Sequence, residues 1–377
     1  MNPLSPPPAE LAPFGVRFER LQSAMRPAKC DSVMLTVDAD LRWLCGVEAM
    51  PLERLTMLIV PQEGRASLVI PTLEAPRVVP QPEFEIVPWG ETTDPLDLVI
   101  DRVGRTANVA IGDRTWARFV IDLMNRTSWQ VRRASELMGP LRINKDESEL
   151  AMLRLAGAAV DRIAARLQHG EITLIGRTEA EVAAEIGRQI LDEGHQCVNF
   201  VIVAAGENAA SPHHEPGNRV IGVDEGVLFD FGGTMVDPWG VGYCSDITRC
   251  VWTGEPTLEV AEIYSVLQQA QQAGVAASRV GMSCESVDHA TREVIETAGY
   301  GEWFMHRTGH GIGIEEHEDP YIVQGNPQAI EPGHVFSIEP GIYLPQRLGF
   351  RLEDIVAAHA VGPESLNRVD HSLFSVG

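Results

Sequence analysis

Four acidic residues lie inside or at the end of apolar segments whose composition predicts β-strands: Asp230 in VLFDFGG, Asp246 in YCSDITR, Glu339 after VFSI and Glu353 in FRLEDIV. Strands select against acids, because a buried charge is costly without a partner. Any one of these acids taken alone is more often a strand end or half of an ion pair. Four together would repel one another and take up protons, so the set indicates a site that supplies strong positive charge.

A pair of divalent cations is the compensation that this pattern favours. Arg351 lies two residues before Glu353, on the same face of a predicted strand, and can stabilise one carboxylate but not four. Hard oxygen ligands together with one imidazole suit manganese, cobalt or zinc better than a soft thiolate site would.

The segment HRTGHGIGIEEH carries three histidines among glycines. The glycines let the backbone approach a site closely and aim His310 inward, so His310 is the candidate imidazole ligand. His306 and His317 would then flank the site. A single histidine in a glycine-rich loop is more often structural, but six of the eleven histidines fall between positions 213 and 317, in the same half of the chain as the four acids.

Other catalytic motifs are incomplete or absent. His214 and Glu215 begin an H-E-x-x-H pattern, but position 218 is asparagine, which excludes a helical mononuclear zinc site. The sequence has no G-x-S-x-G elbow and no G-x-x-x-x-G-K-[ST] loop, and the glycines after position 308 do not complete G-x-G-x-x-G. None of the six cysteines has a diagnostic context, although a cysteine nucleophile is not excluded on this ground.

Composition and charge limit the partners and the compartment. The 377 residues include 30 Lys and Arg against 53 Asp and Glu, and the net charge of -23 would repel phosphate backbones and anionic membrane surfaces. No apolar run approaches the roughly 20 residues of a membrane span, and the N-terminus lacks a basic stretch followed by an apolar run. The scattered cysteines are typical of a reduced protein. We therefore expect a cytoplasmic protein that binds neither nucleic acid nor membranes.

The first part of the chain has the pattern of a compact three-layer αβ domain. After a proline-rich opening, expected to be a frayed or docked arm, comes a helical segment, VRFERLQSAM. Later segments include predicted helices (PLDLVIDRV, TWARFVIDLMNR) and predicted strands (DSVMLTV, LTMLIVP, ASLVIP, FEIVPW, NVAIGD), with QEG as a hairpin turn. A link containing Gly-Pro follows. We place the domain boundary there, between residues 1–143 and 144–377.

The second part of the chain is predicted to be α+β. Its first helix has apolar residues at 150, 153, 156, 160, 163 and 167, and Thr178 with Glu181 forms a capping box for the next helix. Two further amphipathic helices run through LEVAEIYSVLQQAQQAG and CESVDHATREVIETAG. These helices would cover a largely antiparallel sheet built from CVNFVIVAAG, GVLFDFGG, CSDITRCVWTG, HVFSIEPGIY and GFRLEDIVAA.

Taken in order, the four acids and His310 closely resemble the five-ligand site of the pita-bread metallopeptidases, which include aminopeptidase P, prolidase, methionine aminopeptidase and creatinase. The blocks NAASPHHEP, LFDFGG, GYCSDITR, HRTGHGIGIEEHE, SIEPGIY and GFRLEDI follow the family's order over nearly the whole chain. The resemblance implies a C-terminal pita-bread catalytic domain. The extra N-terminal creatinase-like αβα domain is similar to the prolidase, aminopeptidase P and creatinase branch.

The same resemblance implies a role for each matching residue. Two divalent ions are expected, with manganese the first choice and cobalt and zinc the alternatives. Asp230 would chelate one ion, His310 would bind the other, and Asp246 and Glu353 would bridge them. Glu339 would be both a ligand and the proton shuttle for a metal-bridged hydroxide that attacks the substrate.

Further residues would bind the substrate or stabilise the intermediate. His213 resembles the family's substrate-facing histidine, with His214 as the alternative, and His317 resembles the one that stabilises the tetrahedral intermediate. His306 resembles a pocket-lining residue and Arg351 the branch's active-site arginine. The link between Asp230 and Asp246 is longer than the family's usual hairpin, so its tip, residues 237–241, is expected to reach toward the substrate or a neighbouring subunit.

The function implied is a homodimeric, metal-dependent Xaa-Pro peptidase that removes the residue preceding proline. The sequence leaves open whether its substrates are dipeptides or longer peptides, since it does not reveal what would bind a terminal carboxylate. Two alternatives stand beside this reading. One is a creatinase-like enzyme or another small-amide hydrolase on the same scaffold, and the other is a non-catalytic binding adaptor.

Overall fold

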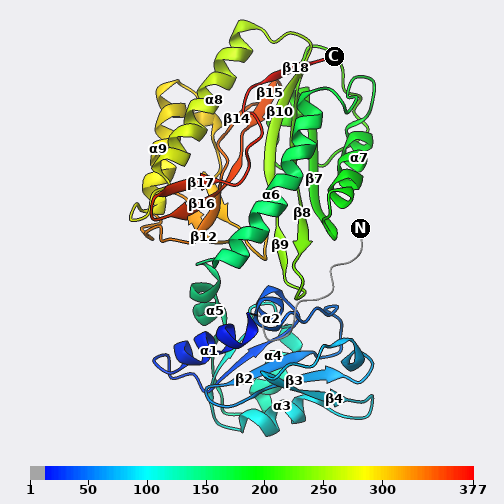
Figure 1. The fold of residues 1–377 in the computed structure, drawn as a ribbon, viewed down its shortest axis with the longest axis vertical. Coiled ribbons are helices and arrows are strands. Elements are labelled where there is room, and N and C mark those ends of the chain that lie inside the picture. The colour runs from blue at the N-terminus through cyan, green and yellow to red at the C-terminus, as the bar shows by residue number, and fades with distance from the viewer. Residues whose placement is uncertain (1–12) are drawn as a thin grey trace. The chain divides into compact units, whose positions relative to one another are not determined.

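The structure, a computed structural model, describes residues 13–377 (Figure 1). The chain divides into two compact units. One comprises the described residues up to Arg142 together with Asp237–Gly242, and the other comprises Ile143–Val236 together with Tyr243–Gly377. The proline-rich opening lies almost entirely outside the described residues. No helix within residues 13–377 is both long and apolar enough to cross a membrane.

The N-terminal unit is built on one six-stranded sheet with the strand order β4-β3-β2-β1-β5-β6. Its neighbouring strands β1, β2 and β3 are antiparallel, and the other pairs are parallel. The predicted strands and the hairpin turn between β2 and β3 are confirmed. The strands are β1 (Ser32–Leu35), β2 (Met57–Pro61), β3 (Ala66–Pro71), β4 (Phe84–Trp89), β5 (Asn108–Ile111) and β6 (Gln130–Arg133).

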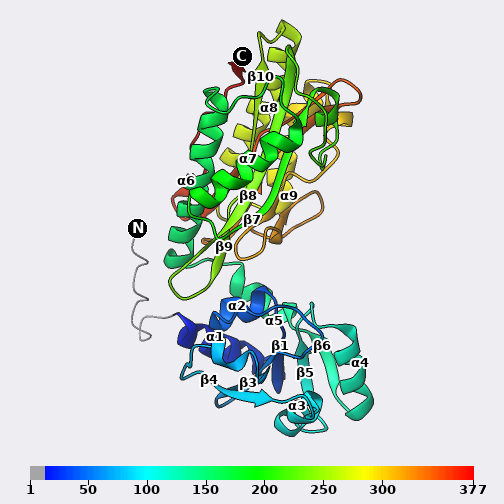
Figure 2. The same cartoon turned by 90° about the vertical axis from the view of Figure 1, so that its right-hand side faces the viewer.

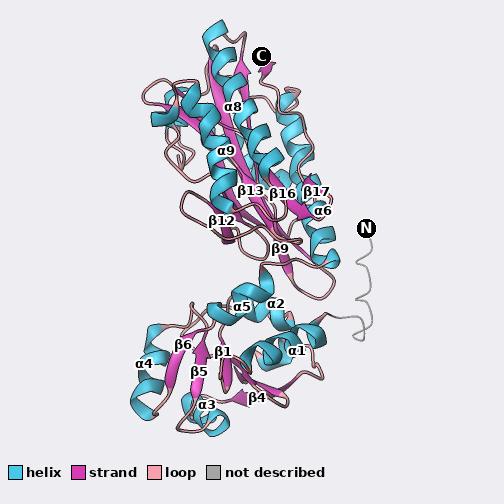
Figure 3. Cartoon of the chain, turned by 90° about the vertical axis from the view of Figure 1, so that its left-hand side faces the viewer, coloured by secondary structure: helices cyan, strands magenta, loops and turns pink. Residues whose placement is uncertain are grey.

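Helices cover both faces of this sheet, which gives the expected three layers (Figure 3). Two of them pack against Met57 and Ile59 of β2 and their neighbours, namely α3 (Pro95–Val103) and α4 (Ala117–Arg126). The other face carries α1 (Phe14–Met25), α2 (Ala39–Cys45) and α5 (Ser135–Arg142). Because β2 is buried on both faces, its sequence is a continuous apolar run. The predicted Gly-Pro link is in fact helical, because Gly139 and Pro140 lie within α5.

The C-terminal unit begins with two helices that have complete capping boxes. Asp146 and Glu149 cap α6 (Glu147–Gln168), and the predicted pair Thr178 and Glu181 caps α7 (Glu179–Asp192). The amphipathic helices α8 (Leu258–Ala277) and α9 (Cys284–Thr297) are also confirmed. Figure 2 shows α6 and α7 lying along the long strands of this unit, while α8 lies behind those strands.

The strands of this unit form three sheets rather than the single sheet expected. Their orders are β18-β10-β8-β7 with β9 beside β8, then β12-β11-β13-β16-β17, and finally the pair β14-β15. Apart from the β8–β9 pair, these neighbouring strands are antiparallel except β10 and β18, which are parallel. The bounds are β7 (Cys197–Ala205), β8 (Glu225–Val236), β9 (Gly242–Cys244), β10 (Ile247–Thr253), β11 (Gly309–Gly311), β12 (Glu318–Ile322), β13 (Val335–Ile338), β14 (Gly341–Leu344), β15 (Leu348–Arg351), β16 (Asp354–His359), β17 (Gly362–Ser365) and β18 (Phe374–Val376).

The two-stranded sheet β14-β15 is separate because two predicted strands are each broken at an acid. HVFSIEPGIY is divided into β13 and β14 at Glu339 and Pro340, and GFRLEDIVAA is divided into β15 and β16 at Leu352 and Glu353. Asp246 likewise directly precedes β10. Three of the four acids therefore lie at strand ends, where a side chain is free to turn toward a site.

Asp230 is the acid that lies inside a strand, and the alternation of β8 orients it. Phe229 and Phe231 join the core beneath α6 and α7, while Leu228 joins the core on the opposite side. Asp230 shares the face of Leu228, because side chains of a strand alternate between its two faces. It therefore points away from the core beneath α6 and α7.

The tip of the long hairpin between β8 and β9 is closed locally. The carboxylate of Asp237 accepts hydrogen bonds from the backbone N–H groups of Trp239 and Val241, at 2.9 and 2.8 Å. This tip, expected to reach toward the substrate or a neighbouring subunit, belongs to the N-terminal unit.

Candidate metal centre

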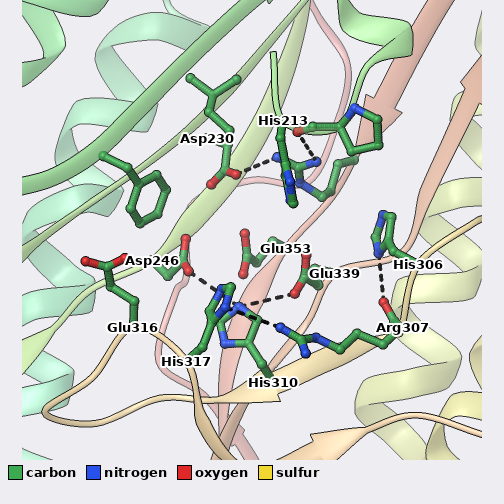
Figure 4. A pocket seen from close by; sticks show the side chains of 14 residues that line it. His213, Asp230, Asp246, His306, Arg307, His310, Glu316, His317, Glu339 and Glu353 are labelled. Atoms are coloured by element: carbon green, nitrogen blue, oxygen red, sulfur yellow. Dashed lines mark hydrogen bonds and ion pairs between the residues drawn. The ribbon is translucent and has the colours of Figure 1, made fainter. Parts of the chain in front are cut away.

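A pocket of about 480 Å³ in the C-terminal unit brings together nine of the ten predicted site residues (Figure 4). In this view the carboxylates of the four acids and the imidazoles of His310 and His317 point toward one another. The predicted residues that line it are His213, Asp230, Asp246, His306, His310, His317, Glu339, Arg351 and Glu353. Phe200, Ile202, Pro212, Arg307 and Glu316 complete the wall. The missing member of the predicted set is His214.

Glycines hold His310 in place by a mechanism different from the one expected. A Cβ atom on Gly309 would overlap the backbone carbonyl of Ser337, and one on Gly311 would overlap that of Asp319. The glycines are therefore needed because β11 is squeezed between β13 and β12, not because the backbone approaches the pocket. Because β11 is held between two strands, it fixes the position of His310 in the pocket.

Hydrogen bonds also fix the tautomer of His310. Its Nδ1 lies 3.1 Å from the carbonyl oxygen of Gly311, which can only accept a hydrogen bond, so Nδ1 carries the proton. Its Nε2 is left with a lone pair and lies 3.2 Å from Oε1 of Glu339 and 3.8 Å from Oδ2 of Asp246. This geometry is typical of a metal-binding imidazole.

Three buried carboxylate oxygens in the pocket have no hydrogen-bond partner among residues 13–377: Oδ1 of Asp230, Oδ1 of Asp246 and Oε1 of Glu353. Buried polar atoms are almost always paired, so three unpaired acceptors in one pocket require an explanation. One ligand atom from each of Asp246, His310 and Glu353 lies within 4.8 Å of the other two. This donor set of carboxylates and one imidazole fits a divalent cation.

The electrostatics of the pocket support the same conclusion. Burial, followed by repulsion from neighbouring carboxylates, raises the pKa of Asp246 and of Glu353. Burial also raises the pKa of Glu339 to about 7. Burial and then the neighbouring His317 lower the pKa of His310 to about 3, so its imidazole is neutral at pH 7. The pocket thus offers a neutral nitrogen ligand beside carboxylates whose negative charge is not fully compensated by nearby cations.

Arg351 does not pair with the carboxylate that its position in the sequence suggested. Its Nη2 donates to Oδ2 of Asp230 at 2.5 Å, and its Nε reaches Glu353 only through the hydroxyl of Thr248. The same-face argument fails because β15 ends at Arg351, so Glu353 is not on the same strand. Arg351 also donates to the carbonyl of Pro212 at 3.1 Å. Arg351 therefore links several segments of the pocket wall and uses four of its five N–H donors in doing so.

His306 is fixed by a chain of hydrogen bonds that starts at the same arginine. Arg351 donates to the hydroxyl of Tyr343 at 2.9 Å, and that hydroxyl lies 2.8 Å from Nε2 of His306. The Nδ1 of His306 lies 2.8 Å from the carbonyl oxygen of Arg307. Both ring nitrogens are thus used inside the protein. The imidazole presents its apolar ring to the pocket.

The remaining predicted histidines, His213, His214 and His317, differ in whether they line the pocket. His213 is exposed on the pocket wall, whereas Nε2 of His214 lies 2.8 Å from the buried carboxylate of Glu179, away from the pocket lining. The structure thus brings His213, and not His214, to the other predicted residues. His317 stands beside His310, with 3.9 Å between ring centroids.

Sequence reasoning missed four residues that shape the site: Thr248, Arg307, Glu316 and Tyr343. Each lies in a motif that was recognised for another residue, such as Thr248 in CSDITR and Arg307 in HRTGH. Proximity to those motifs was the available signal. It did not reveal that Thr248 contacts Glu353 or that Tyr343 contacts Arg351, since those partners come from other segments of the chain.

Comparison with known proteins places this geometry in a family. Residues 151–360 match metallopeptidase family M24, and residues 17–139 match the creatinase/prolidase N-terminal domain. A crystal structure of the dipeptidase PepE from Mycobacterium ulcerans is 39% identical, with a TM-score of 0.88 over 96% of this chain and 97% of that one. A prolidase structure from Thermococcus sibiricus is 33% identical, with a TM-score of 0.88 over 96% and 99%. The Xaa-Pro dipeptidase of Lactobacillus helveticus is 33% identical over 95% of this chain and 98% of its own length.

Proposed function

Because the chain belongs to metallopeptidase family M24, we propose that this dipeptidase-like and prolidase-like enzyme is specific for Xaa-Pro dipeptides. The observation that carries the proposal is the convergence of five candidate ligand residues in one pocket, three of which each have a buried carboxylate oxygen without a hydrogen-bond partner among residues 13–377. We propose that two divalent ions, with manganese the first choice and cobalt or zinc the alternatives, are held by Asp230, Asp246, His310, Glu339 and Glu353.

Divalent ions bound there would compensate the carboxylates, make a water molecule more acidic and polarise the carbonyl of the scissile bond. The chain itself supplies the proton transfer. Burial raises the pKa of Glu339 to about 7 in the metal-free protein. With ions bound, its ionised carboxylate would accept the proton of the water molecule and pass it to the leaving nitrogen. The hydroxyl of Ser337 donates to Oε1 of Glu339 at 3.0 Å and holds the carboxylate in one orientation.

His317 is suited to donate a hydrogen bond to the reacting carbonyl. Its Nδ1 accepts from Nη2 of Arg307 at 3.3 Å, so in the neutral ring the proton is on Nε2. Burial and then the charge of Arg307 lower the pKa of His317, which favours this neutral form. A donor aimed at the oxygen where negative charge develops stabilises the transition state. His213, on the opposite wall, offers a second donor.

Specificity for proline is supported by the apolar part of the wall. Phe200, Ile202 and Pro212 line it together with the ring of His306. A proline ring fits such a surface, and its nitrogen carries no N–H that would be left without a partner there. The pocket volume of about 480 Å³ is in the range of small-ligand sites.

A dipeptidase that does not require proline is the second candidate, which the likeness to the PepE structure favours. Protein stripped with a chelator and reloaded with manganese, cobalt or zinc would be offered Ala-Pro, Ala-Ala, Ala-Pro-Ala and creatine. We expect metal-dependent cleavage of Ala-Pro alone. Equal turnover of Ala-Ala supports the second candidate, and cleavage of the tripeptide supports an aminopeptidase. Turnover of creatine alone contradicts both dipeptidase proposals. A homodimer remains part of the proposal, and light scattering of the purified protein tests it.

A further inference from the structure

A dipeptide brings a negative charge into a pocket that already contains many. Its terminal carboxylate lies one residue beyond the scissile carbonyl, which is roughly 3.5 Å of extended chain. Five carboxylates line the pocket: Asp230, Asp246, Glu316, Glu339 and Glu353. A pocket that binds dipeptides must therefore place a cation about 3.5 Å beyond the scissile carbonyl. Without it, the terminal carboxylate would be repelled by the carboxylates of the pocket.

Two arginines line the pocket, and they differ in what they contact. Arg351 is buried and occupied by Asp230, Thr248, Tyr343 and Pro212. Arg307 is half-buried and, within the part of the chain that the structure describes, forms no ion pair with a carboxylate. Arg307 is thus a pocket cation that no carboxylate among residues 13–377 contacts directly.

Arg307 is held in a defined orientation without a counter-ion. Its guanidinium carbon lies 4.5 Å from the centre of the Tyr321 ring, and its Nη2 donates to His317 at 3.3 Å. Figure 4 shows the guanidinium extending into the pocket toward His317. The bond to His317 uses one of five N–H donors, so others remain for a ligand. A fixed, planar fork of donors matches the two oxygens of a carboxylate.

Arg307 is also connected to the candidate metal centre through His317. His317 lies between them, 3.3 Å from Nη2 of Arg307 and with its ring centroid 3.9 Å from that of His310. Each of these separations is about the length of one extended residue. A carbonyl near His310 and His317 and a carboxylate one residue further along can therefore be bound together.

We propose that Arg307 binds the terminal carboxylate of the substrate and thereby restricts the enzyme to dipeptides. This inference rests on the proposed peptidase function and adds its specificity-determining residue. A longer peptide would place a neutral peptide group at the guanidinium and forgo the charge-assisted hydrogen bonds. The rival reading is that Arg307 only orients His317 and contacts no substrate.

The test compares Ala-Pro with Ala-Pro amide, which differs in lacking the terminal charge. In the metal-loaded wild-type enzyme, kcat/KM for the amide should be about 10- to 150-fold lower. Arg307→Met also removes the bond to His317, so it should lower kcat/KM for both substrates, but it should reduce the acid-to-amide ratio of kcat/KM to less than about threefold. Arg307→Lys should fall between. Arg118→Met is the matched control, because Arg118 is an exposed arginine that stacks 4.8 Å from the ring of Phe119 in the other unit.

Several outcomes would overturn the proposal. If Arg307→Met loses the same fraction of kcat/KM with Ala-Pro and with its amide, at unchanged metal content and melting temperature, Arg307 only orients His317 and does not bind the carboxylate. Equal cleavage of acid and amide by the wild type also rejects it. The proline preference is tested separately by Ala-Ala and its amide, whose ratio reports on Arg307 even if proline is not required. If nothing is cleaved, calorimetric binding of Ala-Pro and its amide to wild type and Arg307→Met decides the same question.

Discussion

Two adjacent acids, Glu353 and Asp354, are both fully buried but have opposite environments. Asp354 accepts hydrogen bonds from Arg249 at 2.8 Å, His371 at 2.8 Å and Gln271 at 3.1 Å. Glu353 accepts one from the Thr248 hydroxyl at 2.7 Å, and its second oxygen has no partner within residues 13–377. The carboxylate of Asp354 therefore belongs to a network in which a cation and further donors compensate its charge. The carboxylate of Glu353, in the pocket beside it, has no such compensation within residues 13–377.

The pKa values of the two acids differ accordingly. Burial alone would raise the pKa of Asp354, but Arg249 and His371 outweigh it and hold that pKa below its usual value. Burial raises the pKa of Glu353, and repulsion from Glu339 and Asp230 raises it further. Burial therefore does not decide whether a carboxylate is structural or functional. A cation in direct contact with the carboxylate does. Asp354 has one in Arg249, whereas Glu353 accepts only from the Thr248 hydroxyl and is therefore a carboxylate for which a bound ion is needed.

Removing an acid from the incomplete pocket should affect activity far more than folding. Glu339→Gln should lower kcat with Ala-Pro by about 100-fold or more, because the proton shuttle is lost. Its thermal unfolding without metal should stay close to that of the wild type at about pH 5, where Glu339 of the folded wild type is protonated. Steady-state kinetics with metal-loaded protein measures this, with metal content determined alongside. Turnover within about tenfold of the wild type would remove Glu339 from the proton transfer.

Removing a cation from the complete network should have the reverse effect. Arg249→Met leaves Asp354 buried beside fewer donors, and breaking such a pair costs about 3–5 kcal/mol of the free energy of unfolding. Urea denaturation of metal-free protein measures the change, with exposed Arg118→Met as the control. A loss below about 1 kcal/mol would mean that this network is not the structural counterpart of the pocket.

The two regions should also respond oppositely to pH. Glu339 has a pKa of about 7 when folded and 4.5 as its ordinary value, so it takes up its proton more readily in the folded state. Its contribution is fully present below about pH 4.5 and is lost as pH rises through 7, which amounts to about 3 kcal/mol. The contribution of Asp354, whose pKa is lowered, is present above its ordinary value of 3.8 and lost as pH falls below it.

Urea midpoints of metal-free protein between pH 5 and 8 test this difference. Stability should fall as pH rises across this range, and loading with manganese should abolish the fall, because a bound ion favours the ionised carboxylates. Glu339→Gln should reduce the slope. A flat profile for the metal-free wild type would contradict the assignment of uncompensated acids to the pocket.

The smallest effects are expected at the neighbouring histidines His213 and His214. His213→Gln should lower kcat/KM by about 10- to 100-fold without changing stability, since it lies on the pocket wall. His214→Gln should leave kcat/KM within about threefold and cost about 1 kcal/mol, because it removes a bond to buried Glu179. Kinetics and denaturation of both variants separate the roles, and an inverted result would reverse our choice between them.

Local rules predicted much of the fold. The capping box of Thr178 and Glu181 begins α7 as expected, and the predicted helix PLDLVIDRV coincides with α3, which Asp94 caps. These signals act within one turn of the chain, so they can be read from neighbouring residues. The break at Glu339 had a local signal that the strand prediction did not use, because Pro340 and Gly341 follow the acid. The break at Glu353 could not be read in this way. Apolar residues flank the acidic pair on both sides, and only the division into separate sheets interrupts the strand.

In the candidate site, too, some features could be predicted from the sequence and others could not. The kinds of residues that meet, acids within apolar segments and a histidine between glycines, are properties of the sequence, because buried charge is tolerated only near an opposite charge. The pairings are properties of the tertiary structure. Arg351 joins Asp230 of another strand instead of nearby Glu353, and Arg307 stands without a carboxylate beside His317. Sequence alone thus determined which charges must meet. Only the packing of three sheets decided which of them neutralise each other and which remain for ions and substrate.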